Sequence, residues 1–250
     1  MEAHQFVREN IPMRREVMVT LFLGECVTYG IFTAINRTTI RSMIVNNHVR
    51  FLGTVLLCAL CLAFETTRAQ PVFVVYKHEH RLELWDNGLM ERQWTICSLS
   101  AVAGRKMRQG DQLVPEGVYA VTSYNARSAS WKTLHINYPN AFDRSQGCTG
   151  GAIGIHGKCA SSGCIGMSNA DMDAIVVALG TRIRRLPIPV LMFASNDSLR
   201  VERLLRLYER QGDGASVEFL RRLEKLRRFW EKEHRVPKFT WDTKGYRITE

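Results

Sequence analysis

Short runs of β-branched and aromatic residues, each followed by a turn, recur from residue 71 to residue 194 and limit how the chain can fold. Residues 71–85 read PVFVVYKHEHRLELW, which predicts two strands around a turn, and Asp86-Asn87-Gly88 then marks a hairpin. Further strands are expected at 93–99, 118–123, 134–136, 152–155 and 188–194. Short strands separated by Gly, Pro and Asn turns predict a mainly β fold, a sandwich or barrel.

Helices are expected within and after the β-rich part. The first spans 169–179, with Ser168 or Asn169 as its cap. Composition shifts at Ser195, and residues 196–210 and 216–233 then have helical periodicity. The second of these segments has an apolar face formed by Phe219, Leu220, Leu223, Leu226 and Trp230. We therefore predict a β-rich domain at 70–195 and a small helical C-terminal extension at 196–250.

The N-terminal part contains a candidate export signal. Residues 51–64 read FLGTVLLCALCLAF, which is shorter than the roughly 20 residues of a membrane span. Arg50 precedes this run, and Thr67-Arg68-Ala69 resembles a cleavage site. A start at Met43 makes 43–69 a signal peptide and leaves 1–42 as a non-native or disordered extension. A buried helix at 51–64 and an N-terminal membrane anchor are the alternatives.

The net charge of +10 favours an anionic partner. Nucleic acid, an anionic membrane surface and an anionic cell-wall polymer all fit that charge. The sequence has no cysteine/histidine finger and no aromatic-glycine RNA signature, so no nucleic acid partner is expected. Because many of the basic residues fall in one helical segment, a solvated basic face remains the simplest interpretation.

Residues 150–172, GGAIGIHGKCASSGCIGMSNADM, carry the chemistry. His156 ends a predicted strand, Gly157 permits a turn, and Cys164 follows eight residues after the histidine. A thiol needs a base to become a good nucleophile, and an imidazole is suited to that role. Gly163 allows tight backbone geometry, so the amides of Gly163 and Cys164 are candidates to stabilise an oxyanion. The pattern predicts a cysteine acyl-transfer site.

The cysteines leave other interpretations open. A buried structural cysteine is one, and a zinc site made by Cys148, His156, Cys159 and Cys164 is another, although compact C-x-x-C pairs are absent. Export would favour disulfides. The pairing of Cys97, Cys148 and Cys159 is not fixed by the sequence. A Cys148–Cys159 bridge is favoured over a Cys159–Cys164 bridge because it leaves Cys164 free.

A family resemblance accompanies these residues. IHG…SSGCIGM resembles the active-site motif of the YkuD-type L,D-transpeptidases, in which His-Gly precedes Ser/Thr-x-Gly-Cys. YKHEHRLELW, GRKMRQGDQLVPEGVYAV, INYPNAFDR and FWEKEHRVPKFTWDTKGYRI resemble the YafK-like branch, so the resemblance spans about 72–248. Ser162 stands where the wider family has His and Gly166 where it has Arg. The branch also departs at both positions.

The resemblance implies a β-rich catalytic domain with a small helical extension. It implies a periplasmic enzyme that acts on peptidoglycan stem peptides at meso-diaminopimelate, in cell wall remodelling and cell shape. Cys164 matches the nucleophile and His156 the base, with the Gly157 carbonyl orienting the imidazole. Cys159 matches a cysteine of the branch. No cofactor and no metal are implied.

Substrate contacts and the fate of the acyl-enzyme stay open. Arg105, Lys106 and Arg108 lie in a loop suited to substrate carboxylates, or simply solvated. Ser162 is expected beside the site, and Asn140 and Asp143 are expected to shape the cleft. An amine acceptor gives transpeptidation. Water gives hydrolysis, which in this branch implies release of a peptidoglycan-linked protein, with an outer-membrane protein as the partner. The rival of another class is an inactive cell-wall-binding module.

Overall fold

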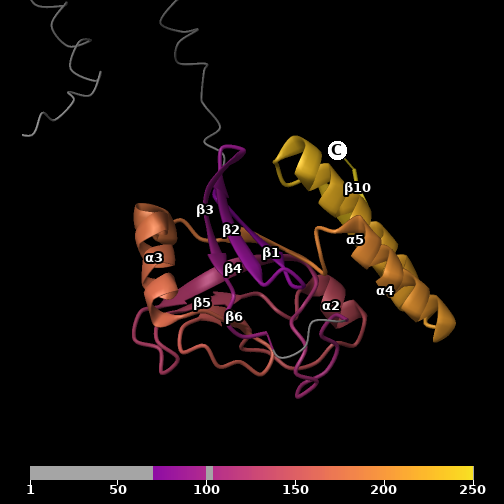
Figure 1. Cartoon of the computed structure of the whole chain (residues 1–250), viewed down its shortest axis with the longest axis horizontal. Coiled ribbons are helices and arrows are strands. Elements are labelled where there is room, and N and C mark those ends of the chain that lie inside the picture. The colour runs from indigo at the N-terminus through magenta and orange to yellow at the C-terminus, as the bar shows by residue number, and fades with distance from the viewer. Residues whose placement is uncertain (1–69, 100–103, 250) are drawn as a thin grey trace, which may run out of the picture. The chain divides into compact units, whose positions relative to one another are not determined.

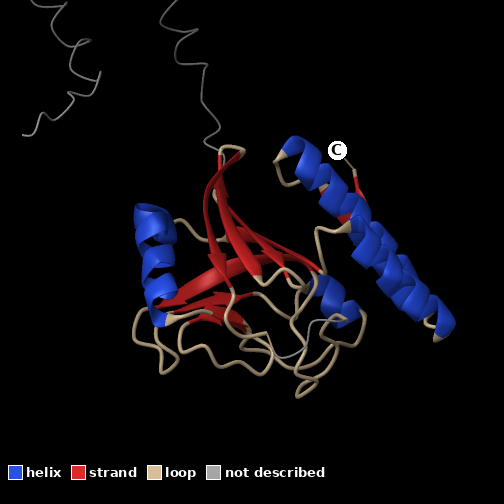
Figure 2. Ribbon diagram, viewed as in Figure 1, coloured by secondary structure: helices blue, strands red, loops and turns tan. Residues whose placement is uncertain are grey.

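The computed structural model describes residues 70–99 and 104–249, and their centre is one eight-stranded sheet. Neighbouring strands β1 and β8, and β6 and β7, are parallel, and the other pairs are antiparallel. Figure 2 shows the sheet curling, which confirms the mainly β prediction. In spatial order the strands are β3 (Leu89–Thr95), β2 (Arg81–Asp86), β1 (Val72–Tyr76), β8 (Ile188–Phe193), β4 (Gly117–Asn125), β5 (Thr133–Ile136), β6 (Gly154–His156) and β7 (Ile165–Gly166).

Strand β1 is buried on both faces, which explains its unbroken run of apolar residues. Side chains alternate between the faces of a strand. Phe73 and Val75 therefore enter one hydrophobic core, and Val72, Val74 and Tyr76 enter another on the opposite face. The sheet thus needs a cover on each side.

Helix α3 (Asn169–Leu179) covers the first face, as Figure 1 shows. It buries Met172, Ile175 and Leu179 in the core of that face. The Ser168 hydroxyl caps the helix by accepting a hydrogen bond from the Asp171 amide, as the sequence predicted. A short 3-10 helix, Gly180–Arg184, then leads toward β8.

The opposite face is covered by the C-terminal segment. Helices α4 (Ser198–Arg210) and α5 (Gly214–Glu233) occupy the two segments predicted to be helical. Phe219, Leu223, Leu226 and Trp230 of α5 pack in one core with β1 and β8. A hairpin, β9 (Phe239–Asp242) and β10 (Gly245–Ile248), follows and was not predicted. A domain boundary at residue 195 stays a prediction.

The structure departs from the predicted position of one strand. The strand expected at 93–99 is wrong in position, since β3 begins directly after the turn at Asn87 and Gly88. Both turn residues have positive φ, which suits a two-residue hairpin and starts the partner strand at once. The extension at 1–42 and the signal peptide at 43–69 lie outside the described residues. No helix within residues 70–99 and 104–249 is long and apolar enough to cross a lipid bilayer.

Candidate active site

The segment that carries His156 and Cys164 forms two neighbouring strands. Strand β6 ends at His156, and β7 begins directly after Cys164. The strands are parallel, with Ile155 opposite Ile165, and both isoleucines are fully buried in the core. His156 is the last residue of β6, and Cys164, the residue before β7, packs against the same core. The short spacing in the sequence therefore brings the imidazole and the thiol to two adjacent strands.

The Cys164 thiol is half-buried and free. Its Sγ donates a long hydrogen bond of 3.6 Å to the Ala152 carbonyl. Burial raises the pKa of the thiol above its ordinary value, while the Gly154 amide and the Lys106 ammonium act in the opposite direction. A thiol with a raised pKa is largely protonated at neutral pH, so it needs a base to react.

His156 is oriented by a main-chain carbonyl. Its Nδ1 lies 2.7 Å from the Gly157 oxygen. A carbonyl only accepts, so Nδ1 carries the proton and the neutral ring presents the lone pair of Nε2. No hydrogen bond joins this ring to the Cys164 sulfur within residues 70–99 and 104–249. Such pairs often close only in the substrate complex.

A cleft of about 710 Å³ opens beside the thiol. It brings together three residues predicted from the sequence, Lys106, Ser162 and Cys164. Glycine and alanine residues supply part of the remaining wall. The full lining is Lys106, Gln109, Gly110, Gln112, Gly150, Gly151, Ala152, Ile153, Ser162 and Cys164. The buried ammonium of Lys106 lies in the wall of this cleft.

The Lys106 ammonium is fixed by a carboxylate that sequence reasoning missed. Its Nζ donates to Asp111 Oδ1 at 2.7 Å and to the Arg108 carbonyl at 3.0 Å. Asp111 Oδ2 accepts from the Met107 and Arg108 amides, and Oδ1 also accepts from the Leu113 amide. Burial alone would raise the pKa of Asp111, but these hydrogen bonds outweigh it and lower the pKa to about 2. Asp111 is therefore ionised at neutral pH.

The other two basic residues of this loop do not line the cleft. The Arg105 guanidinium lies 4.1 Å from the centre of the Phe219 ring and also faces Phe142. The Arg108 side chain is exposed and its carbonyl supports Lys106. Consecutive residues in an irregular loop point in different directions, which spacing alone does not reveal. Of the three basic residues, only Lys106 therefore lines the cleft, and Arg105 and Arg108 do not.

Asn140 and Asp143 lie outside the cleft wall and stabilise a short helix. They form the capping box of helix α2 (Ala141–Ser145), in which each side chain accepts from the other's amide. The Asn140 side-chain Nδ2 also donates to the Val118 carbonyl, and Asp143 accepts from the buried Tyr119 hydroxyl. Their contacts are structural, and neither residue lines the cleft.

The Gly163 amide, a candidate oxyanion donor, is engaged in this structure. It donates to the Ser161 hydroxyl oxygen at 3.3 Å, and that hydroxyl donates to the Cys164 carbonyl at 2.6 Å. Ser161 therefore shapes the turn that presents Cys164. Its neighbour Ser162 was predicted from the sequence, whereas Ser161 was not.

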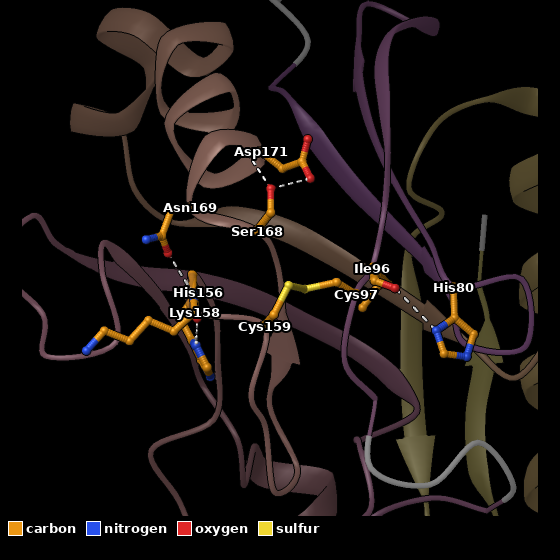
Figure 3. The surroundings of a disulfide bond; sticks show 10 residues. His80, Ile96, Cys97, His156, Lys158, Cys159, Ser168, Asn169 and Asp171 are labelled. Carbon is orange, nitrogen blue, oxygen red and sulfur yellow. Dashed lines mark hydrogen bonds between the residues drawn. A yellow bond between two sulfur atoms is a disulfide. The ribbon is translucent and has the colours of Figure 1, made fainter.

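The favoured Cys148–Cys159 bridge is wrong. Cys159 pairs with Cys97, 62 residues away, and Cys148 remains a free, buried thiol beside Met107. The pairing follows from the sheet, because the Cys97 amide donates to the Gly166 carbonyl of β7. Figure 3 shows the bridge close to the loop that follows His156. Because the disulfide consumes the Cys159 sulfur, the four-residue zinc set is not available.

Comparison with known proteins identifies the family. Residues 70–188 match the family model of YkuD, the L,D-transpeptidase catalytic domain. This part of the chain belongs to the YkuD family. The Escherichia coli (strain K12) protein YafK, classed by name with the L,D-transpeptidases, is 37% identical over 112 residues, which cover 42% of this chain. The chain spans 46% of the length of that relative.

Solved structures resemble the YkuD domain at lower identity. The helical cell shape determining protein Pgp2 of Campylobacter jejuni is 16% identical, with a TM-score of 0.46, and the match covers 71% of this chain and 74% of that chain. The C442S mutant of an Enterococcus faecium L,D-transpeptidase is 14% identical, with a TM-score of 0.32 and 50% of each chain covered. Both likenesses are distant.

The YkuD domain thus places a free thiol and a buried ammonium in the wall of one cleft, and an oriented imidazole on the strand next to the thiol. Asp111, Ser161 and Ala152 complete this arrangement and were not singled out from the sequence. The Gly-Asp pair in RQGDQ is the one signal that points to Asp111, since Asp after Gly is typical of turns. The other two act through backbone contacts, which sequence spacing does not encode.

Proposed function

We propose that this chain is a Cys164-dependent acyl-transfer enzyme acting on peptidoglycan stem peptides at meso-diaminopimelate. The observation that supports this most is the Nδ1 bond of His156 to the Gly157 carbonyl, which leaves the lone pair of Nε2 unused on the strand next to the one that follows the free thiol. Membership of the YkuD family supports a cell-wall enzyme. The expected compartment is the periplasm, reached by the export signal at 43–69.

The proposed chemistry proceeds in two steps. His156 Nε2 takes the Cys164 proton, and the thiolate attacks the carbonyl carbon at the L-centre of the diaminopimelate residue. The carbon–nitrogen bond then breaks, the leaving amine takes the proton from His156, and a thioester remains. The Cys164 amide is the proposed oxyanion donor. The raised pKa of the thiol makes the imidazole necessary rather than incidental.

Lys106 is the proposed anchor for a substrate carboxylate. An ammonium has three N–H donors, and Asp111 and the Arg108 carbonyl use two of them. The third is available to an anion in the cleft. Ser162, also in the cleft wall, is the proposed polar contact nearby. Arg105 and Arg108 are not proposed to touch substrate, because neither lines the cleft.

The second step decides the reaction class. An amine that attacks the thioester carbonyl gives a new cross-link and returns the thiol, which is transpeptidation. Water gives a free carboxylate, which is hydrolysis and would release a protein linked to peptidoglycan, such as an outer-membrane protein. Ser162 and Gly166, which replace a His and an Arg of the wider family, favour keeping hydrolysis as the second candidate. An inactive cell-wall-binding module is the rival that lacks either reaction.

Product analysis separates these alternatives. The wild type, Cys164→Ala and His156→Gln are incubated with muropeptides and with protein-linked muropeptides, and products and acyl-Cys164 are detected by mass spectrometry. We expect no acyl-enzyme from Cys164→Ala and a rate lowered about 10²–10⁴-fold for His156→Gln. Cys148→Ala, which removes a free cysteine outside the cleft, is the matched control and should keep activity. Identical products from wild type and Cys164→Ala would refute the proposal.

A further inference from the structure

Trp131 is a large exposed aromatic residue beside the His156–Gly157 segment. Its side chain is 41% exposed. It precedes β5, in which Thr133 pairs with His156. A Cβ added to Gly157 would lie 2.7 Å from the Trp131 Cβ and 3.1 Å from its Cγ. Gly157 therefore lets the indole approach the carbonyl that orients the imidazole.

The position of Trp131 is held by two unusual features. Its φ is +57°, a left-handed conformation that is costly for a residue with a large side chain. The indole Nε1 donates to Asp173 Oδ1 of α3 at 2.8 Å, and the Lys132 ammonium pairs with the same carboxylate at 2.7 Å. A strained backbone and a hydrogen-bonded ring fix an apolar surface that faces solvent. Such an arrangement is more typical of a binding surface than of core packing.

The indole lies outside the Lys106 cleft. That cleft is lined by Lys106, Ser162 and Cys164 among others, but not by Trp131 or His156. Trp131 instead lies beside Gly157, whose carbonyl orients the His156 ring. In the proposed chemistry His156 gives its proton to the leaving amine and receives one from the acceptor. The amine-bearing group must therefore approach His156. The Lys106 cleft and the surface at Trp131 would thus contact different parts of the substrate.

We infer that Trp131 is a specificity-determining residue whose indole binds the amine-bearing peptide, the group that leaves or accepts at the thioester. This inference rests on the proposed function. The ring would pack against Cα–H groups and apolar side-chain atoms of that peptide, with its orientation set by Asp173. Aromatic contacts of this kind favour extended peptides over small amines because only the former reach the ring.

The first test compares leaving groups. Two muropeptide substrates share the acyl part but release either a peptide or ammonia, and kcat/KM is measured for wild type, Trp131→Ala, Trp131→Phe and Trp241→Ala. Trp241 is 42% exposed on the β9–β10 hairpin and is the matched control. Trp131→Ala should lower kcat/KM about tenfold for the peptide-releasing substrate and less than about twofold for the other. Trp131→Phe should keep most of the activity. Equal losses for both substrates, or none, would overturn the inference.

The second test does not depend on turnover. In a Cys164→Ala background, calorimetry measures the binding of the free amine-bearing peptide. Adding Trp131→Ala should weaken binding about tenfold, and adding Trp241→Ala should leave it unchanged. Unchanged binding in the Trp131 variant would overturn the inference. Trp131-dependent binding, together with a wild-type protein that forms no product in the first test, would refute the acyl-transfer proposal and keep the peptide site.

Discussion

Two loops frame the Cys164 cleft, and different forces hold them in shape. The basic loop, residues 104–113, is organised by charged side chains. The Asp111 carboxylate gathers the Lys106 ammonium and three amides. The buried Lys77 ammonium donates to the Gly104 carbonyl at 2.6 Å and to the Val114 carbonyl at 3.0 Å, which ties the two ends together.

The β6–β7 loop, residues 157–163, is held by covalent and backbone geometry. The Cys97–Cys159 disulfide joins it to the segment after β3. The Cys159 amide donates to the Met167 carbonyl, and the Lys158 amide donates to the Asn169 side chain. Perturbing ionised groups should therefore affect the basic loop, whereas reduction should affect the β6–β7 loop.

Removing the disulfide should have the largest effect. The bridge closes a segment with a sequence separation of 62, and a bond of this kind contributes about 2–4 kcal/mol to the free energy of unfolding. Cys97→Ala should lose about that much in denaturant unfolding and should also lower activity, because the loop between His156 and Cys164 loses its anchor.

Reductant provides the control for that prediction. Both bridged cysteines are exposed, so dithiothreitol should destabilise the wild type and Cys148→Ala by similar amounts. It should leave Cys97→Ala unchanged, since no bridge is left to reduce. Equal stability of wild type and Cys97→Ala under oxidising conditions would show that the β6–β7 loop does not depend on the bridge.

Gly163 is the point where the two loops meet, and its substitution is expected to disturb both. Its φ is +126°, and an added Cβ would lie 3.2 Å from the Leu113 carbonyl oxygen and 3.6 Å from Lys106 Nζ. Gly163→Ala should cost roughly 1–3 kcal/mol of stability through backbone strain and should lower kcat/KM. Gly151→Ala is the control, because Gly151 lines the same cleft with no atom within 4 Å of its added Cβ. Equal melting temperatures of the two variants would show that the fold does not depend on a close contact between the loops at Gly163.

The sequence predicts local features of this site well. Alternation predicted β1 and β2, and the spacing of His156, Gly157 and Cys164 predicted the thiol and imidazole on neighbouring strands. These features depend on residues close together in the chain, where periodicity and turn chemistry act. The family resemblance built on the same residues is confirmed by the YkuD match.

Contacts between distant segments were beyond the sequence. Cys97 meets Cys159 only because β7 pairs with the segment after β3. Arg105 and Lys106 are adjacent, yet one stacks on Phe219 of α5 and the other lines the cleft. Both outcomes depend on how the sheet curls and where α5 packs, which no local pattern specifies.

Asp111→Asn should test the charged framework of the basic loop. An amide cannot hold the Lys106 ammonium and three backbone amides as a carboxylate does, since charge-assisted hydrogen bonds are stronger. We expect KM for the acyl substrate to rise about tenfold, with a smaller change in kcat. Glu202→Gln, which removes a carboxylate from an exposed pair on α4, should leave KM unchanged. A lower KM for Asp111→Asn would mean that Asp111 competes with substrate for Lys106 instead of shaping the loop.

The pH dependence of the same framework should give the smallest effect. The folded pKa of Asp111, about 2, lies below its ordinary value of 3.8. A lowered folded pKa stabilises the fold at pH values above 3.8, and this contribution is lost as the pH falls toward 2. The stability difference between wild type and Asp111→Asn should therefore be constant from about pH 5 to 8 and should shrink below about pH 4. Urea unfolding at several pH values measures this difference in the free energy of unfolding. The difference between wild type and Cys97→Ala, which reports the disulfide, should not change with pH in the same way. A difference that persists at pH 2 would mean that Asp111 acts through shape and not through charge, and the contrast between the two loops would fail.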